Sequence, residues 1–426
     1  MTSGYSRPLK YVREVTGVAS LEEAEILRQQ PFWVVVHQSA SARAQNLVRA
    51  LVAIAVRSCS GEINVRILGT GEFRDGIESI AETEALGYGC IERLSIADYS
   101  ENEKIGAGIT IGMQLPNMIA VDASGMYAAV NHVLVPSAPP PHSAAACFAA
   151  ATAFAKYFAS TVLDKHVSKN ESWGFSLDTM SVSAPTELVL HKPVKESTLG
   201  KVHLLGAGAI GSAFCFSVHL SNDAAEIDIL DREKYDEPNQ ETTFFLTKAE
   251  AVRCPPKAAQ LAKNSSREGL PVVGRPKREL QAGDSFLEEQ CDAFVCAVDN
   301  AETRRILDSA KCNVLLNGGL GGSKSDAGHV LVSWHNAGVR GLAELYPDDI
   351  SPDNGNSSSL PSEIKDDCSR LEYESVSLAA PFVALSSGAL LHAFCKLSAE
   401  GRLPDANYFK LDLLRLQSKM SRKLLC

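Results

Sequence analysis

The sequence predicts an α/β protein in which doubly wound parallel sheets are formed by two consecutive halves. Short apolar, β-branched runs alternate with segments whose apolar residues recur at helical spacing, the pattern of parallel strands joined by crossover helices. In the second half a glycine-rich turn separates one such strand from its helix. The first half repeats the strand–helix–strand order without glycines, which predicts a degenerate copy of the same unit.

The first half opens with a charged arm at residues 1–30, which includes a short helix at 21–29. Its first strand is predicted at residues 32–36 (FWVVV), and the turn that follows, HQSASARA, contains no glycine. The other elements expected there are a helix at 42–57, strands at 63–68, 118–122 and 132–135, and an alanine-rich helix at 143–163. Residues 164–199 are polar and mixed, so we interpret them as the joint and divide the chain into domains 1–190 and 191–426.

The second half is organised around residues 201–212 (KVHLLGAGAIGS), where a strand runs into a glycine loop and a helix. Gly206, Gly208 and Gly211 have GxGxxG spacing: the first allows a tight turn, the second lets backbone amides approach a phosphate, and the third lets the helix pack closely on the strand. Twenty residues after Gly211, Asp231 ends the next strand, where such Rossmann-like folds place an acid that binds a ribose hydroxyl. The segment therefore predicts a nucleotide site.

The remaining elements continue the alternation. Strands are expected at residues 270–273, 293–298, 314–317 and 329–334, with helices at 301–310 and 376–396 and a short strand-like tail. Residues 347–367 are rich in Pro, Asn, Asp and Ser and are expected to form an exposed, mobile loop.

Composition excludes several classes of protein. The net charge of −10 argues against nucleic acid or an anionic membrane as the main partner, because both attract basic surfaces. No apolar run is long enough to span a bilayer, and the N-terminus lacks a signal-peptide core, so a cytoplasmic location is expected. The 11 cysteines include no CxxC pair, which argues against a structural zinc site of the usual spacing.

Several polar residues follow strands of the second half. Asn239 lies eight residues after Asp231, Lys257 begins a helix after two prolines, and Asp299 and Asn300 follow a strand, with Arg304 one helical turn later. In an open parallel sheet the carboxyl ends of the strands share one edge, so these groups can converge over a nucleotide. A triphosphate needs cations and a metal-binding carboxylate, which Lys257, Arg304 and Asp299 would supply.

Four segments in this order, GAGAIGS, ILDREKYDEPNQ, PPKAA and CAVDNAETRR, resemble the ThiF/MoeB and ubiquitin-activating enzyme superfamily over about residues 200–335. The resemblance implies use of ATP and Mg²⁺ to adenylate the C-terminal carboxylate of a ubiquitin-like protein. It implies that Asp231 binds the ribose, Asn239 and Lys257 the phosphates, and Asp299 the metal. The chain departs from the family at Thr242, where an arginine is usual.

The resemblance extends to the N-terminus, where residues 4–9 (GYSRPL) look like the arm that opens these enzymes. In two-half members, an arginine of the inactive half reaches the ATP of the other half. We therefore expect Arg7 to act as an arginine finger within an internal pseudo-dimer, for which a monomer would be sufficient.

A catalytic cysteine is expected at Cys368, which follows the polar loop and precedes a Pro-containing apolar helix, as in the autophagy-type activating enzymes. A cysteine on a polar loop could displace AMP from an acyl adenylate to form a thioester. Two preceding aspartates oppose its ionisation, and Cys254 and Cys312 are the reserve candidates.

The leading hypothesis is a compact activating enzyme, such as those of bacterial ubiquitin-like conjugation systems, that passes its substrate to a conjugating enzyme. The alternative within the family adenylates a sulfur-carrier protein or a peptide and forms no thioester. A dinucleotide-dependent oxidoreductase would leave Lys257, Asp299 and Asn300 without a role, and a scaffolding pseudoenzyme is disfavoured by the presence of Asp299 and Lys257.

Overall fold

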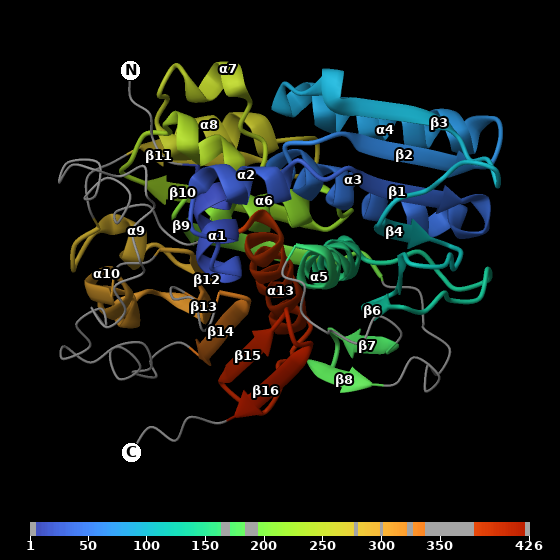
Figure 1. Cartoon of the computed structure of the whole chain (residues 1–426). Helices are drawn as coiled ribbons and strands as arrows, with labels where there is room; N and C mark the ends of the chain where they lie inside the picture. Colours follow the sequence, from blue (N-terminus) through green and yellow to red (C-terminus); the bar gives the residue numbers. More distant parts are fainter. Residues whose placement is uncertain are drawn as a thin grey trace.

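A computed structural model describes residues 6–162, 171–183, 195–276, 280–298, 301–321, 327–336 and 379–421. These residues form two eight-stranded mixed sheets with helices packed against them, an α/β Rossmann-like architecture that confirms the predicted fold class (Figure 1). Asp299, Asn300, Cys368 and the loop at 347–367 lie outside the described residues, as does the predicted boundary between residues 190 and 191.

The first sheet has the strand order β3-β2-β1-β4-β5-β6-β7-β8. Its strands are β1 (Phe32–His37), β2 (Ile63–Leu68), β3 (Leu94–Asp98), β4 (Gly108–Ile111), β5 (Ile119–Ser124), β6 (Tyr127–Val130), β7 (Trp173–Ser176) and β8 (Ser181–Ser183). The helical segments of this half are α1 (Arg7–Thr16), α2 (Leu21–Arg28), η1 (Gln38–Ala40), α3 (Ser41–Ser58), α4 (Glu72–Tyr88), η2 (Ile91–Arg93) and α5 (Ser143–Thr161).

The second sheet has the order β11-β10-β9-β12-β13-β14-β15-β16. Its strands are β9 (Thr198–Leu205), β10 (Ala224–Asp231), β11 (Val272–Pro276), β12 (Cys291–Cys296), β13 (Cys312–Leu320), β14 (His329–Asn336), β15 (Tyr408–Asp412) and β16 (Gln417–Ser421). Its helical segments are α6 (Ala209–His219), η4 (Glu237–Glu241), α7 (Lys248–Ala251), α8 (Lys257–Ser265), α9 (Ser285–Glu288), α10 (Ala301–Ile306), η5 (Leu307–Ser309) and α13 (Pro381–Ala399).

The two sheets share one topology. In each, five parallel strands are followed by three antiparallel ones, and a long apolar helix, α5 or α13, separates the first antiparallel strand from the second. The parallel order expected of the doubly wound sheet holds for five strands of each sheet, and the antiparallel strands at this end were not foreseen. The sequence pattern of a strand does not reveal the direction of its partner, and a helix such as α5 between β6 and β7 looks like a parallel crossover although the two strands pair antiparallel.

The halves are joined through their long helices. Figure 1 shows α5 and α13 beside each other in the middle of the molecule, and α13 also packs on α6 and on β13. By length and composition α13 could span a membrane, but 89% of its apolar window is buried by the rest of the fold. Its apolar surface is thus already covered by protein, as in a core helix.

One predicted strand is a loop whose backbone bonds to a side chain instead of to a neighbouring strand. Residues 132–135, expected as a strand, form a loop after Asn131, whose φ of 56° ends β6. The carbonyl oxygens of Val135 and Pro136 accept hydrogen bonds from Arg43, which is itself paired with Asp122 at 2.8 Å in the core. The backbone in this loop is thus partly satisfied by a buried arginine rather than by a strand neighbour.

The N-terminal arm, expected to be helical only at residues 21–29, contains a further helix. Residues 7–16 form α1, which buries Tyr11 and Val12 and ends at Gly17 in the left-handed conformation. Tyr11 donates a hydrogen bond to the carbonyl of Ala327 in the second half, at 3.1 Å. The first half therefore contacts the second through α1 as well as through α5.

Candidate functional site

The glycine loop connects β9 to α6, and its three glycines meet different surroundings. Gly206 has a φ of 99°, which permits the turn at the end of the strand. A Cβ on Gly211 would lie 1.9 Å from the carbonyl oxygen of Gly206, so the helix packs directly on the turn. A Cβ on Gly208 would meet nothing within 4 Å. The loop is thus closed by Gly211 and open to a ligand at Gly208.

Two side chains hold this loop in place. Asp231, at the end of β10, accepts a hydrogen bond from the amide of Ala207 at 2.7 Å and one from the amide of Glu233 at 2.8 Å. Tyr235, buried, donates its hydroxyl to the carbonyl of Ala207 at 2.6 Å. Burial raises the pKa of Asp231, and these amide hydrogen bonds oppose the shift. Sequence reasoning missed Tyr235, although it lies inside the segment ILDREKYDEPNQ that carried the resemblance.

Lys257 lies at the start of α8, next to the chain that leaves β10. Its Nζ is 2.5 Å from Oε2 of Glu233, and its amide donates to the Glu233 carbonyl at 2.9 Å. The hydrogen bond from Lys257 is the main reason that the pKa of Glu233 is lowered, and the charges of Arg232 and Arg7 act in the same direction. The lysine therefore has a carboxylate partner that a phosphate could replace.

Asn239 lies in η4 and is 3% exposed, with its Oδ1 buried and without a hydrogen-bond partner. Its backbone N–H donates a hydrogen bond to the Asp236 carboxylate at 3.1 Å, as part of the cap of η4. An unpartnered buried amide oxygen costs free energy, so this side chain is suited to accept a donor from a ligand. Thr242, the departure from the family pattern, is fully buried, and its hydroxyl also lacks a partner.

Arg304 lies beside the end of β12 and contacts the backbone there. Its Nε donates to the carbonyl oxygen of Val298 at 3.0 Å, and its Nη2 to the same oxygen at 2.5 Å. It thereby fixes the end of β12, beside Gly206, against which Val298 packs. In the described state Arg304 supports the sheet edge, with two of the five N–H donors of its guanidinium directed at this carbonyl.

The cysteines divide sharply by exposure. Among those the structure describes, Cys254 is exposed and the others are buried. Cys254 has a φ of 48° and lies three residues before Lys257. Cys312 is buried beside Cys291, whose hydrogen bond lowers its pKa, but a buried thiol cannot reach a bound protein tail. Of the two reserve nucleophiles, only Cys254 is accessible.

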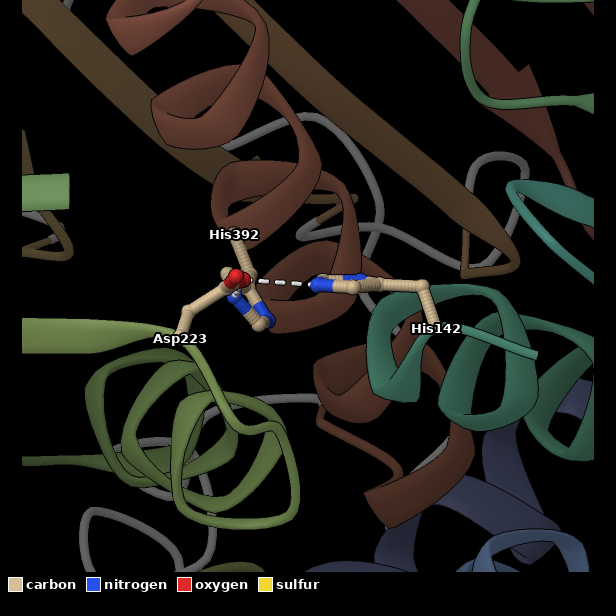
Figure 2. Close-up of side chains that lie close together, drawn as sticks. All are labelled: His142, Asp223 and His392. Carbon is tan, nitrogen blue, oxygen red and sulfur yellow. Dashed lines mark hydrogen bonds and ion pairs between the residues drawn. The ribbon is translucent and has the colours of Figure 1, made fainter. Parts of the chain in front are cut away.

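Two further side-chain clusters bring together groups that can bind metal ions. In the first, Asp223 Oδ2 is 2.6 Å from Nε2 of His142 and 3.2 Å from Nε2 of His392 (Figure 2). The other ring nitrogens are also occupied: the Ala144 amide donates to Nδ1 of His142, and Nδ1 of His392 is 2.9 Å from the Ser217 hydroxyl. Since a carboxylate only accepts, both imidazoles donate their Nε2 protons to it.

The charge of this first cluster is also balanced, because Nζ of Lys396 lies 3.4 Å from Oδ1 of Asp223. Its members are the N-cap residue of α5 (His142), two residues of α13 and the residue before β10, so it joins the two halves. A second cluster, His203 with Asp228 and Glu289, has its carboxylates paired with Arg275 (2.6 Å from Asp228) and with Lys201. A metal ion would have to displace these cations, so we assign neither cluster a metal.

A cavity of about 370 Å³ lies in the first half, between the end of α5 and the loop before β5. Its polar lining comes from Gln114, Asn117, Tyr157, Ser160 and Thr161. No charged side chain lines it, which makes it unsuited to phosphate. The glycine loop, with a lysine, an aspartate and an open backbone around it, remains the candidate for nucleotide binding.

The fold and this loop define the class: a two-sheet α/β protein with a Rossmann-like loop. Comparison with known families matches residues 200–400, just under half of the chain, to the BilD C-terminal domain. No curated protein matched.

Solved structures with some similarity include E. coli MccB with ATP and SeMet PaaA. MccB has 13% sequence identity and a TM-score of 0.40, over 53% of this chain and 65% of the MccB chain. PaaA has 14% identity and a TM-score of 0.37, over 52% of this chain and 64% of its own. The chain thus spans less than two thirds of the length of either.

Proposed function

We propose that the second half binds ATP with Mg²⁺ at the glycine loop and adenylates the C-terminal carboxylate of a ubiquitin-like protein. The observation that carries the proposal is the arrangement of three groups at one sheet edge: the open backbone at Gly208, the half-buried carboxylate of Asp231 and the cation of Lys257. A ribose fits beside Asp231, and a phosphate chain fits beside Lys257 and the open backbone at Gly208, where the N-terminus of α6 also favours an anion.

In this proposal each residue has one task. Asp231 accepts from a ribose hydroxyl, Lys257 and the Nδ2 group of Asn239 donate to phosphate oxygens, Oδ1 of Asn239 is left to accept from another donor of the ligand, and Asp299 holds the metal. Attack by the substrate carboxylate on the α-phosphorus releases pyrophosphate and forms an acyl adenylate. Arg7, whose charge acts on Glu233, supplies a further cation from the first half. The substrate class rests on the motif resemblance alone.

The next step is proposed at Cys368. Its thiolate attacks the acyl carbonyl carbon, the bond to AMP breaks, and the resulting thioester passes to the thiol of a conjugating enzyme. The alternative is adenylation of a sulfur-carrier protein or a peptide without a thioester. Whether a thiol accepts the acyl group separates the two.

Two assays test this proposal. ATP–pyrophosphate exchange that depends on a ubiquitin-like protein with a free C-terminal carboxylate is expected, and its absence with ATP and Mg²⁺ present would contradict adenylation. A thiol-sensitive adduct with that protein should disappear in Cys368→Ala and persist in Cys254→Ala, the accessible control. An adduct lost only in Cys254→Ala would identify Cys254 as the nucleophile. ATP–pyrophosphate exchange without any adduct would favour adenylation without a thioester.

A further inference from the structure

The N-terminal helix of the first half is held at the candidate nucleotide site by one carboxylate of the second half. Oε1 of Glu241 accepts the hydroxyl of Ser6 at 2.7 Å, and Oε2 accepts the amide of Arg7 at 3.1 Å. Glu241 therefore bonds both the N-cap residue of α1 and the first residue of the helix. A carboxylate at this position also interacts favourably with the helix dipole.

This contact is reinforced from α2. Arg28 Nη1 lies 3.3 Å from the Ser6 hydroxyl, and its Nη2 lies 3.8 Å from Oε1 of Glu241. The Glu241 side chain is 20% exposed, and burial raises its pKa, while Arg28 opposes the shift. The carboxylate thus lies largely out of water and is bonded mainly to the N-terminal arm. The bonded residues are 234 or 235 positions apart, so the contact is made by the tertiary fold and not by closeness in the sequence.

Glu241 is also tied to the candidate site through its own element. It ends η4, the 3₁₀ helix that contains Asn239, two residues earlier. On the other side of the contact, Arg7 is half-buried, and its charge lowers the pKa of Glu233, after the larger effect of Lys257. The carboxylate therefore connects the element that carries Asn239 to the residue whose charge reaches the Lys257–Glu233 pair.

From these contacts we infer that Glu241 is a positioning residue: it fixes the start of α1 so that the Arg7 guanidinium is directed to the phosphate chain of ATP. The inference rests on the proposed function and adds a residue to it. In this arrangement Glu241 does not itself touch the phosphates, because its two carboxylate oxygens are already bonded to Ser6 and Arg7. Loss of Glu241 should then weaken binding of phosphates and leave binding of the nucleoside unchanged.

The test compares the affinities of the full-length protein for MgATP and for adenosine by isothermal titration calorimetry. Arg7→Ala should weaken MgATP binding about tenfold or more, as expected for a lost charge-assisted hydrogen bond. Glu241→Gln should weaken MgATP binding by several-fold with adenosine affinity unchanged, and the double variant should be no worse than Arg7→Ala alone. Glu237→Gln, an exposed acid at the start of η4, is the matched control and should equal the wild type.

Ser6→Ala provides a second variant, which removes one donor to Glu241 from the arm side and should show the same selective loss if Glu241→Gln does not fold. The inference is overturned if both variants bind MgATP like the wild type, if adenosine affinity falls as much as MgATP affinity, or if the losses of Glu241→Gln and Arg7→Ala multiply in the double variant. A wild-type protein that binds no MgATP would instead overturn the proposed function, and with it this role of Glu241.

Discussion

Lys257 and Glu233 form an ion pair with unequal partners. The lysine side chain is 10% exposed and the glutamate side chain 58% exposed, so the lysine has more to lose when the pair breaks. An incoming phosphate can replace the glutamate as partner, while the glutamate returns to water at little cost. In the absence of a phosphate, Glu233 would therefore keep the Lys257 ammonium charged and in place.

This asymmetry gives a prediction at the residue scale. Lys257→Ala should weaken MgATP binding by about 10- to 100-fold, since a charge-assisted hydrogen bond contributes about 1.5–3 kcal/mol. Glu233→Gln should bind MgATP as well as the wild type or slightly better, because it removes the competing carboxylate. Calorimetry on the two variants measures both effects. If Glu233→Gln lost affinity as strongly as Lys257→Ala, the carboxylate would be part of the binding site.

At the scale of elements, two glycines of the loop differ in their surroundings: Gly211 is tightly packed and Gly208 is open. The overlap of a Cβ on Gly211 with the Gly206 carbonyl concerns two backbones, which cannot move apart without separating α6 from β9. Gly208 has no such neighbour within 4 Å, and its φ of −81° suits any residue. One position is therefore fixed by packing, and the other is left open.

The corresponding prediction separates stability from binding. Gly211→Ala should lower the free energy of unfolding by about 1–3 kcal/mol or more, the usual range for overpacking. Gly208→Ala should leave the unfolding midpoint close to that of the wild type and weaken MgATP binding, because a methyl group would stand where phosphate approaches. Denaturant unfolding and calorimetry give both values. Equal MgATP affinity in Gly208→Ala and the wild type would show that no phosphate lies there.

The elements also show how far sequence reasoning reaches. It found β1, β2, β9, β10 and the glycine loop because apolar runs and glycine spacing are local signals. It missed α4, β4, β7 and β8: β4, β7 and β8 have three or four residues each, too few to show a period, and α4 carries only three buried residues among charged ones. The strand–helix–strand repeat was predicted from the sequence, whereas the order that all eight strands of each sheet share became visible only from their pairing in three dimensions.

Candidate site residues divide in the same way. Gly206, Asp231 and Lys257 could be found because each follows a strand or begins a helix in a recognisable pattern. Tyr235 and Glu241 could not, because their roles depend on hydrogen bonds to Ala207 and to α1 that no local pattern encodes. Arg304 was found, but its binding to the Val298 carbonyl depends on the geometry of the strand end.

At the scale of the whole molecule, the two halves meet around a buried polar cluster. His392 is fully buried on α13, and Asp223, which binds both His142 and His392, belongs to the second half while His142 belongs to the first (Figure 2). Burial lowers the pKa of His392 to about 4, an effect that the hydrogen bond with Asp223 opposes. The imidazole is therefore neutral in the folded protein at pH 7.

A pH dependence of stability follows from that shift. Between pH 6.5 and about 4 the unfolded chain binds a proton that folded His392 does not, so stability falls as the pH falls through this window. The full effect is on the order of 3 kcal/mol. His392→Gln should flatten this part of the profile of unfolding free energy against pH, whereas His132→Gln, a half-exposed control, should not. Identical slopes in His392→Gln and the wild type would show that the pKa of His392 is the same in the folded and unfolded states.

In the proposed function the carboxyl edge of the second sheet holds a metal-bound triphosphate at the glycine loop. A structure determined with a non-hydrolysable ATP analogue and Mg²⁺ would show whether it does. We expect the phosphate chain over the amides of residues 206–208, the ribose against Asp231, and Lys257 turned from Glu233 to a phosphate oxygen. An empty loop at saturating nucleotide, or a nucleotide bound elsewhere with the Lys257–Glu233 pair intact, would contradict the account.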